Sequence, residues 1–246
     1  EEFASLIKGF EGLLGGEISP RKLSEAIELH NRQRALLREL YGLRKQDPPL
    51  LYGSEVTQIL VAVMSLPAQE ANDLLADLIP EVRDRRDGPE SRSARLLMSG
   101  NELDDCSLIE MIEECGAHVV TDDLCIGTRF FFKDVEVGGD PLEAIARHYL
   151  GDIMCPRTYR GRVGMTRRQE LKERFGHVKD FANEFNANGA IIYVLKYCDA
   201  EEWDVPDLRD YLQENGLPVL HIEHDYSTVA LAPLRTRVQA FVEMVG

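Results

Sequence analysis

The chain lacks the short motifs that mark the commonest nucleotide-binding and hydrolase sites. It contains no GxGxxG, no GxxxxGK[ST], no HExxH and no GxSxG. Direct nicotinamide binding, P-loop ATP binding, a zincin centre and an α/β-hydrolase nucleophile are therefore poorly supported. The sequence also shows no signal-peptide pattern and no run of about 18 apolar residues. We accordingly expect a cytoplasmic protein with no membrane segment.

Positive charge is scarce as well. The 246 residues include 28 Lys and Arg against 43 Asp and Glu, a formal net charge of -15. This balance disfavours nucleic acid or an anionic membrane as a partner, although a local basic pocket for a phosphorylated ligand remains open. The five cysteines are odd in number and include no CxxC pair, which indicates reduced thiols rather than a disulfide framework. Cys106 and Cys115 fall within one expected helix and are predicted to be small buried packing residues.

The first 90 residues read as a helical region. Apolar residues recur at helical spacing over 2–14, 20–44, 54–65 and 68–86. The polar, Gly-Pro-terminated run 83–89 marks the clearest internal boundary. We therefore predict a helical region over 1–90, continuing from a part of a longer chain, and a second domain over 91–246.

The second domain alternates short apolar segments with helical stretches. The segments expected to be strands cover residues 95–100, 118–121, 190–196 and 218–223. Strands that alternate with helices predict a parallel sheet flanked by helices, and hence the α/β class.

Two of the expected strands run into cysteine-containing loops. One is followed by Asp122, Asp123, Cys125 and Arg129, and another by Cys198. Ligands of open α/β sheets bind beyond the carboxyl ends of the strands, so both thiols are expected at one edge of the sheet.

Cys155 lies between these two cysteines, in the basic loop 152–160. Thiolates are soft ligands for zinc or iron–sulfur clusters, but separations of 30 and 43 residues are no local metal motif. Two alternatives stay open: packing cysteines, or a nucleophile–base pair of Cys125 with His221 or His224. The cluster Phe130 to Phe132 is either core packing or an apolar wall that shields a site.

Six ordered stretches carry a resemblance to a known family. They are GNELDD at 100–105, IEECGA at 112–117, DDLCIGTR at 122–129, DPLEAIA at 140–146, LKYCD at 195–199 and LPVLHIEHDY at 217–226. The set resembles the D-component family of 2-hydroxyacyl-CoA dehydratases, which includes the cluster-bearing subunits of ATP-dependent benzoyl-CoA reductase. The match is to the C-terminal part of the family pattern.

The resemblance implies a flavodoxin-like or Rossmann-like sheet and an oxygen-sensitive [4Fe-4S] cluster or related iron–sulfur centre. It also implies three partners: a homologous second subunit, an ATP-hydrolysing iron–sulfur activator and an acyl-CoA substrate. One electron gives a ketyl radical at the thioester carbonyl, after which water leaves the 2-hydroxyacyl chain. Cys198, in Lys-Tyr-Cys-Asp, matches a cluster ligand, and Cys125 and Cys155 match recurring cysteines.

Three arginines near these cysteines are candidates for contact with the CoA phosphates: Arg129, Arg157 and Arg160. For Arg129 an ion pair with Asp122 or Asp123 is an equal alternative. The leading hypothesis is a dehydratase-type iron–sulfur subunit, with a benzoyl-CoA reductase subunit as the near alternative. A non-catalytic electron-transfer or scaffold subunit, and a plain α/β binding domain, remain as further alternatives.

Overall fold

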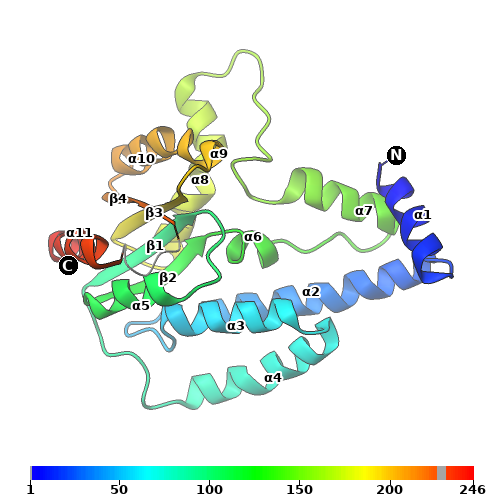
Figure 1. Ribbon diagram of the computed structural model, residues 1–246, viewed down its shortest axis with the longest axis horizontal. Helices are drawn as coiled ribbons and strands as arrows, with labels where there is room; N and C mark the ends of the chain where they lie inside the picture. Colours follow the sequence, from blue (N-terminus) through cyan, green and yellow to red (C-terminus); the bar gives the residue numbers. More distant parts are fainter. Residues whose placement is uncertain (1, 226–230) are drawn as a thin grey trace.

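The centre of the protein is a four-stranded parallel sheet (Figure 1), seen in a computed structural model that describes residues 2–225 and 231–246. The strand order is β2-β1-β3-β4, and every neighbouring pair is parallel. The strands are Ala94–Gly100 (β1), Ala117–Asp123 (β2), Gly189–Leu195 (β3) and Val219–His224 (β4). The prediction of an α/β fold with a parallel sheet is confirmed, and the order 2-1-3-4 is that of flavodoxin-like sheets.

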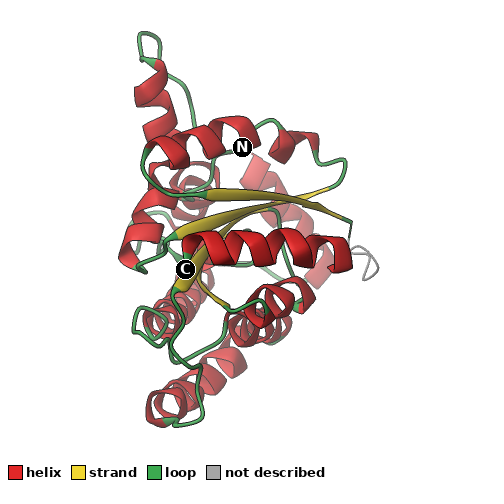
Figure 2. Ribbon diagram, turned by 90° about the vertical axis from the view of Figure 1, so that its left-hand side faces the viewer, coloured by secondary structure: helices red, strands yellow, loops and turns green. Residues whose placement is uncertain are grey.

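Helices cover both faces of the sheet (Figure 2). Helices α5 (Ser107–Glu114) and α11 (Leu231–Val245) pack on the face that presents Met98 and Ile191. Helices α8 (Arg167–Glu184) and α10 (Val205–Glu214) pack on the opposite face. Because successive side chains of a strand point to opposite faces, the nearly continuous apolar runs of β1 and β3 supply both cores.

The helical region borders the sheet on the β2 side. Its helices are Glu2–Leu14 (α1), Pro20–Gly42 (α2), Gly53–Ser65 (α3) and Ala68–Asp84 (α4). Ser19 caps α2, since its Oγ accepts the N–H of Lys22 at 3.4 Å. Helices α2, α3 and α4 form a core that includes Val120 of β2. The region therefore covers what would otherwise be an open edge strand.

Four short helices complete the described chain. They are Thr128–Phe131 (α6), Pro141–Arg147 (α7), the π-helix His148–Asp152 (η1) and Asp199–Glu202 (α9). Helices α1 and α7 contact each other well away from the sheet (Figure 1). Within the described ranges, no helix combines the length and the apolar character needed to cross a bilayer. Tyr226, the last residue of the 217–226 stretch, lies outside the described residues.

One boundary differs from the prediction in a way that matters for the site. Strand β2 extends to Asp123, so the two aspartates expected in a loop belong to the strand, and both are buried. Each carboxylate accepts a buried hydrogen bond. The Thr128 main-chain N–H donates to Asp122, and Arg129 Nε donates to Asp123. These donors make a polar strand end tolerable inside the protein.

The carboxyl ends of β1 and β3 lie at the topological switch point. From β1 the chain continues to β2 on one side, and from β3 it continues to β4 on the other. The two strand ends are close: Gly100 has a φ of +147°, and a Cβ there would lie 1.8 Å from the Tyr193 carbonyl oxygen. Only glycine permits this approach. Such a switch point is where open α/β sheets bind ligands.

Candidate metal-binding site at the carboxyl edge of the sheet

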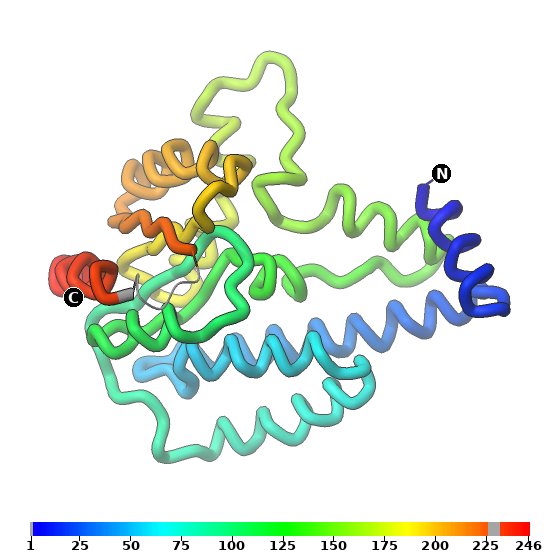
Figure 3. The backbone as a smooth tube through the Cα atoms, in the orientation of Figure 1, coloured from blue at the N-terminus to red at the C-terminus, as the bar shows by residue number. Residues whose placement is uncertain are grey.

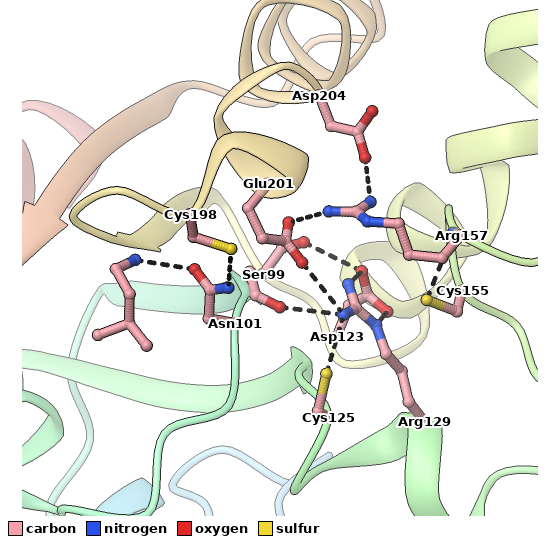
Figure 4. A network of polar contacts seen from close by, with 12 residues as sticks. Ser99, Asn101, Asp123, Cys125, Arg129, Cys155, Arg157, Cys198, Glu201 and Asp204 are labelled. Atoms are coloured by element: carbon pink, nitrogen blue, oxygen red, sulfur yellow. Dashed lines mark hydrogen bonds and ion pairs between the residues drawn. The ribbon is translucent and has the colours of Figure 1, made fainter.

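Three cysteines from three separate segments meet at this edge (Figure 4). Cys125 follows β2, and Cys198 follows β3 in the turn that leads into α9. Cys155 lies in the connection 153–166 between η1 and α8, which extends away from the sheet (Figure 3) before returning to it. Cys125 and Cys198 follow parallel strands and therefore lie at the same edge of the sheet, as predicted.

A buried ion pair lies at the centre of the site. Arg129 donates from Nε and Nη2 to the two carboxylate oxygens of Asp123, at 2.9 and 2.8 Å. Ser99 Oγ donates to the same carboxylate at 3.0 Å, and His177 Nε2 lies 3.3 Å from it. Burial alone would raise the pKa of Asp123, but Arg129 and His177 hold it well below its usual range.

A second carboxylate links this centre to the Cys155 loop. Glu201 lies 3.7 Å from Arg129 Nη1 and 2.6 Å from Arg157 Nη2. Arg157 also pairs with the buried Asp204, which in turn pairs with Arg174. The chain of alternating charges ties α9 and the 153–166 connection to the end of β2.

Each of the three sulfur atoms accepts one N–H hydrogen bond. The donors are Asn101 Nδ2 to Cys198 at 3.2 Å, Arg129 Nη1 to Cys125 at 3.5 Å and the Arg157 main-chain N–H to Cys155 at 3.5 Å. Donors of this kind stabilise negative charge on sulfur, and they tune iron–sulfur centres.

The three thiols are soft ligands, of the type that binds zinc or iron–sulfur clusters. In the parts of the chain that the structure covers, no three His, Cys, Asp or Glu side chains are grouped tightly enough to hold one ion. Cys125 is open to solvent, and Cys155 and Cys198 are partly so. The pKa of Cys125 is raised overall. Desolvation by the surrounding protein raises it most, the charge of Arg129 lowers it, and the nearby Cys155 raises it.

The three candidate arginines occupy different environments. Arg129 is buried against Asp123, which is the structural alternative considered for it. Arg157 is engaged by Glu201 and Asp204. Arg160 is exposed, and its Nη1 donates to two main-chain carbonyls at 3.0 and 2.9 Å. Phosphate contact by these arginines stays a prediction, and Arg160 is the member with the most accessible guanidinium.

The aromatic cluster is packing rather than a wall over the thiols. The Phe131 ring lies 4.5 Å from that of Tyr41, and the Phe132 ring lies 4.8 Å from that of Phe181. Phe130 packs against the core of the helical region, beside Phe131. The core-packing alternative is therefore confirmed.

One minor prediction about the cysteines needs correction. Cys115 is buried as expected, but Cys106 is partly exposed at the start of α5, where its thiol donates to Glu110 at 3.1 Å. The strand order also disfavours the alternative that pairs Cys125 with His221 or His224. Those histidines belong to β4, three strand intervals from β2, which corresponds to about 14 Å.

Several residues of the site were not singled out from the sequence. They are Ser99, Asn101, His177, Glu201 and Asp204. Asn101 carried a signal, because it directly follows the glycine that ends an apolar strand. His177 carried none, since it lies in the middle of a helix and reaches the site only through packing.

A comparison of the sequence with known families gives one match over almost the whole chain. The profile of the 2-hydroxyglutaryl-CoA dehydratase D-component matches residues 1–245. Individual proteins of similar sequence are named as subunits of CoA-ester dehydratases or of benzoyl-CoA reductase. One of the subunits of benzoyl-CoA reductase from Thauera aromatica is 24% identical over 99% of this chain and 62% of its own length. The (R)-phenyllactyl-CoA dehydratase beta subunit of Clostridium sporogenes is 23% identical, over 96% and 60%.

A third relative is the beta subunit of (R)-2-hydroxyglutaryl-CoA dehydratase from Acidaminococcus fermentans. It is 25% identical over 97% of this chain and 62% of its own length. The chain thus spans about three fifths of the length of the curated relatives it matches.

Proposed function

Because the chain belongs to the 2-hydroxyglutaryl-CoA dehydratase D-component family, we propose that it is an iron–sulfur subunit, or part of one, of a 2-hydroxyacyl-CoA dehydratase. The observation that carries the proposal is that Cys125, Cys155 and Cys198 lie around the carboxyl edge of the sheet (Figure 4), each with an N–H donor at its sulfur. A [4Fe-4S] cluster bound there would supply a low-potential electron to an acyl-CoA thioester and so open a ketyl-radical route to loss of water.

The residues of this chain have separable tasks in that proposal. Cys198 is the first ligand, and Cys125 and Cys155 are its partners across the sheet edge. Asp123 compensates the charge of Arg129 and fixes its guanidinium, whose Nη1 donates to the Cys125 sulfur. Glu201 holds the Cys155 loop against the sheet through Arg157. Arg160 is the candidate for a CoA phosphate, because it is an exposed residue whereas Arg129 is buried.

The partners follow from the same proposal. The electron comes from an ATP-hydrolysing iron–sulfur activator, and the enzyme is completed by a homologous second subunit. The relatives, each named as one subunit of an enzyme, support a multi-subunit assembly. Membership of a benzoyl-CoA reductase is the second candidate, favoured by the similarity to the Thauera aromatica protein. Supplying the activator with 2-hydroxyacyl-CoA and with benzoyl-CoA in parallel separates the two.

The test is the iron and acid-labile sulfide content per chain after anaerobic purification. Wild type is expected to hold about four of each, and Cys198→Ser to lose most of both. Cys115→Ser is the matched control. Cys115 is a buried thiol at the C-terminal end of α5, away from the cysteine site, so this variant should retain the wild-type iron and sulfide content. Iron that is absent from wild type, or equal in all three proteins, would contradict the proposal.

A further inference from the structure

Asn101 is a buried side chain at the carboxyl end of β1 with both of its amide atoms engaged. Its Oδ1 accepts the main-chain N–H of Leu195 at 2.8 Å, and its Nδ2 donates to Cys198 Sγ at 3.2 Å. A main-chain N–H can only donate, so the bond from Leu195 fixes which end of the amide is the oxygen. The NH₂ group must then face the sulfur.

The turn that carries Cys198 is held in an unusual conformation. The Cys198 N–H donates to the Leu195 carbonyl at 3.0 Å. Tyr197 between them has a φ of +68°, in the left-handed region that residues other than glycine rarely adopt. The Tyr197 side chain is 96% exposed, so burial of its ring does not compensate this conformation. The turn places the Cys198 sulfur next to Asn101, across the switch point.

We infer that Asn101 is the positioning residue of Cys198 and that its N–H tunes the group which Cys198 holds. The inference rests on the proposed function for the identity of that group, an iron–sulfur centre. Negative charge on the centre grows on reduction, and an N–H donor at a ligand sulfur stabilises that charge. Asn101 therefore raises the reduction potential of the centre and fixes the direction of the Cys198 side chain.

The experiment uses two variants at this position and one matched control. Asn101→Asp keeps an oxygen for the Leu195 N–H but removes the donor to sulfur, whereas Asn101→Ala removes both contacts. The control is Asn188→Asp. Asn188 likewise accepts a strand N–H, that of Arg95 at 2.8 Å, and donates to main-chain carbonyls, but it lies at the opposite edge of the sheet. Circular dichroism checks that each variant is folded.

Two readouts separate positioning from general stability. The first is the midpoint potential of the reconstituted centre, followed by electron paramagnetic resonance. It should shift to more negative values in both Asn101 variants and stay at the wild-type value in Asn188→Asp. The second is alkylation of Cys198 in metal-free protein, measured relative to Cys125 in the same molecule. A carboxylate beside the sulfur repels the thiolate, so Asn101→Asp should slow this reaction about fivefold.

The outcomes distinguish the two claims. A wild-type centre whose potential and thiol alkylation are unchanged in both Asn101 variants would overturn the inference and leave the proposed function intact. A wild-type chain that binds no iron would defeat the proposed function. The alkylation ratio then decides the positioning role alone: a decrease in Asn101→Asp that is absent from Asn188→Asp supports it, and a ratio unchanged in Asn101→Asp refutes it.

Discussion

Two neighbouring aspartates illustrate how the residue scale sets up the site. Asp122 and Asp123 are consecutive in β2, so their side chains point in opposite directions. Asp122 accepts the Tyr41 hydroxyl at 2.6 Å and the Thr128 N–H at 2.8 Å. Burial, followed by the charge of Asp122, raises the pKa of Tyr41 well above its usual value, so Tyr41 stays a hydrogen-bond donor. Asp122 thus anchors the helical region, whereas Asp123 organises the cysteine site.

The buried pair makes a sharp prediction at this scale. Arg129→Ala leaves the Asp123 carboxylate buried without its bidentate partner, and we expect a loss of about 3–5 kcal/mol in the free energy of unfolding. Arg21→Ala is the control, because Arg21 forms an exposed pair with Glu25, and such pairs contribute about 0–1 kcal/mol. Urea denaturation measures both. Equal losses in the two variants would show that the buried pair is not a structural centre.

At the scale of elements, the site depends on how closely β1 approaches β3. The two strands pair in parallel up to Gly100 and Tyr193, and the Asn101 N–H then donates to the Tyr193 carbonyl at 3.3 Å. This close approach places the end of β1 directly beside the turn that carries Cys198. A side chain at position 100 would force the strand ends apart.

Gly100→Ala tests that dependence. A Cβ 1.8 Å from the Tyr193 carbonyl oxygen cannot be accommodated without movement of the backbone, so we expect a loss of more than about 3 kcal/mol in stability, above the range for left-handed strain alone. Gly116→Ala is the control. Gly116 also has a positive φ, of +96°, but nothing lies within 4 Å of its Cβ position, and its cost should be about 1–2 kcal/mol. Thermal denaturation of both proteins gives the comparison.

At the scale of the whole molecule, one chain carries a sheet with two covered faces and a helical region that closes one edge. The net charge is -15, while the cysteine edge gathers several arginines within a network of carboxylates. His118 and His148 are buried in the surrounding layers. Their burial gives the molecule a characteristic response to acid.

Stability should fall as the pH decreases below about 6.5. Burial lowers the pKa of His118 and His148, both buried, below the ordinary value of about 6.5. The unfolded chain then binds more protons than the folded one, so the stabilisation present above that pH is lost on acidification, by up to about 1.4 kcal/mol per pH unit for each histidine. Urea denaturation between pH 7.5 and 5.5 measures the slope.

His118→Gln provides the internal comparison for this slope. His118 is buried, and its Nε2 lies 2.7 Å from the Glu90 carbonyl. Removing the titrating ring should flatten the pH dependence of the free energy of unfolding, whatever stability the variant loses at neutral pH. A slope equal to that of wild type would show that His118 titrates alike in the folded and unfolded chain.

Much of the architecture was determined by the sequence itself. Apolar periodicity located the long helices, and the alternation of short apolar segments with helical stretches predicted a parallel sheet flanked by helices. Cysteines just after two strands predicted thiols at one sheet edge, since parallel strands end on the same side. The resemblance to the dehydratase family likewise rested on short ordered stretches and is confirmed by the match over residues 1–245.

Only the tertiary structure decided which groups serve the thiols. Local pattern could not show that Arg129 is committed to Asp123, that Glu201 joins the Cys155 loop to the sheet, or that His177 reaches across from α8. These contacts join residues far apart in the chain, and their partners are chosen by strand order and helix packing. The amide of Asn101 faces Cys198 for the same reason. The apolar periodicity of the sequence determines where helices and strands form, whereas their packing determines which of their ends come together.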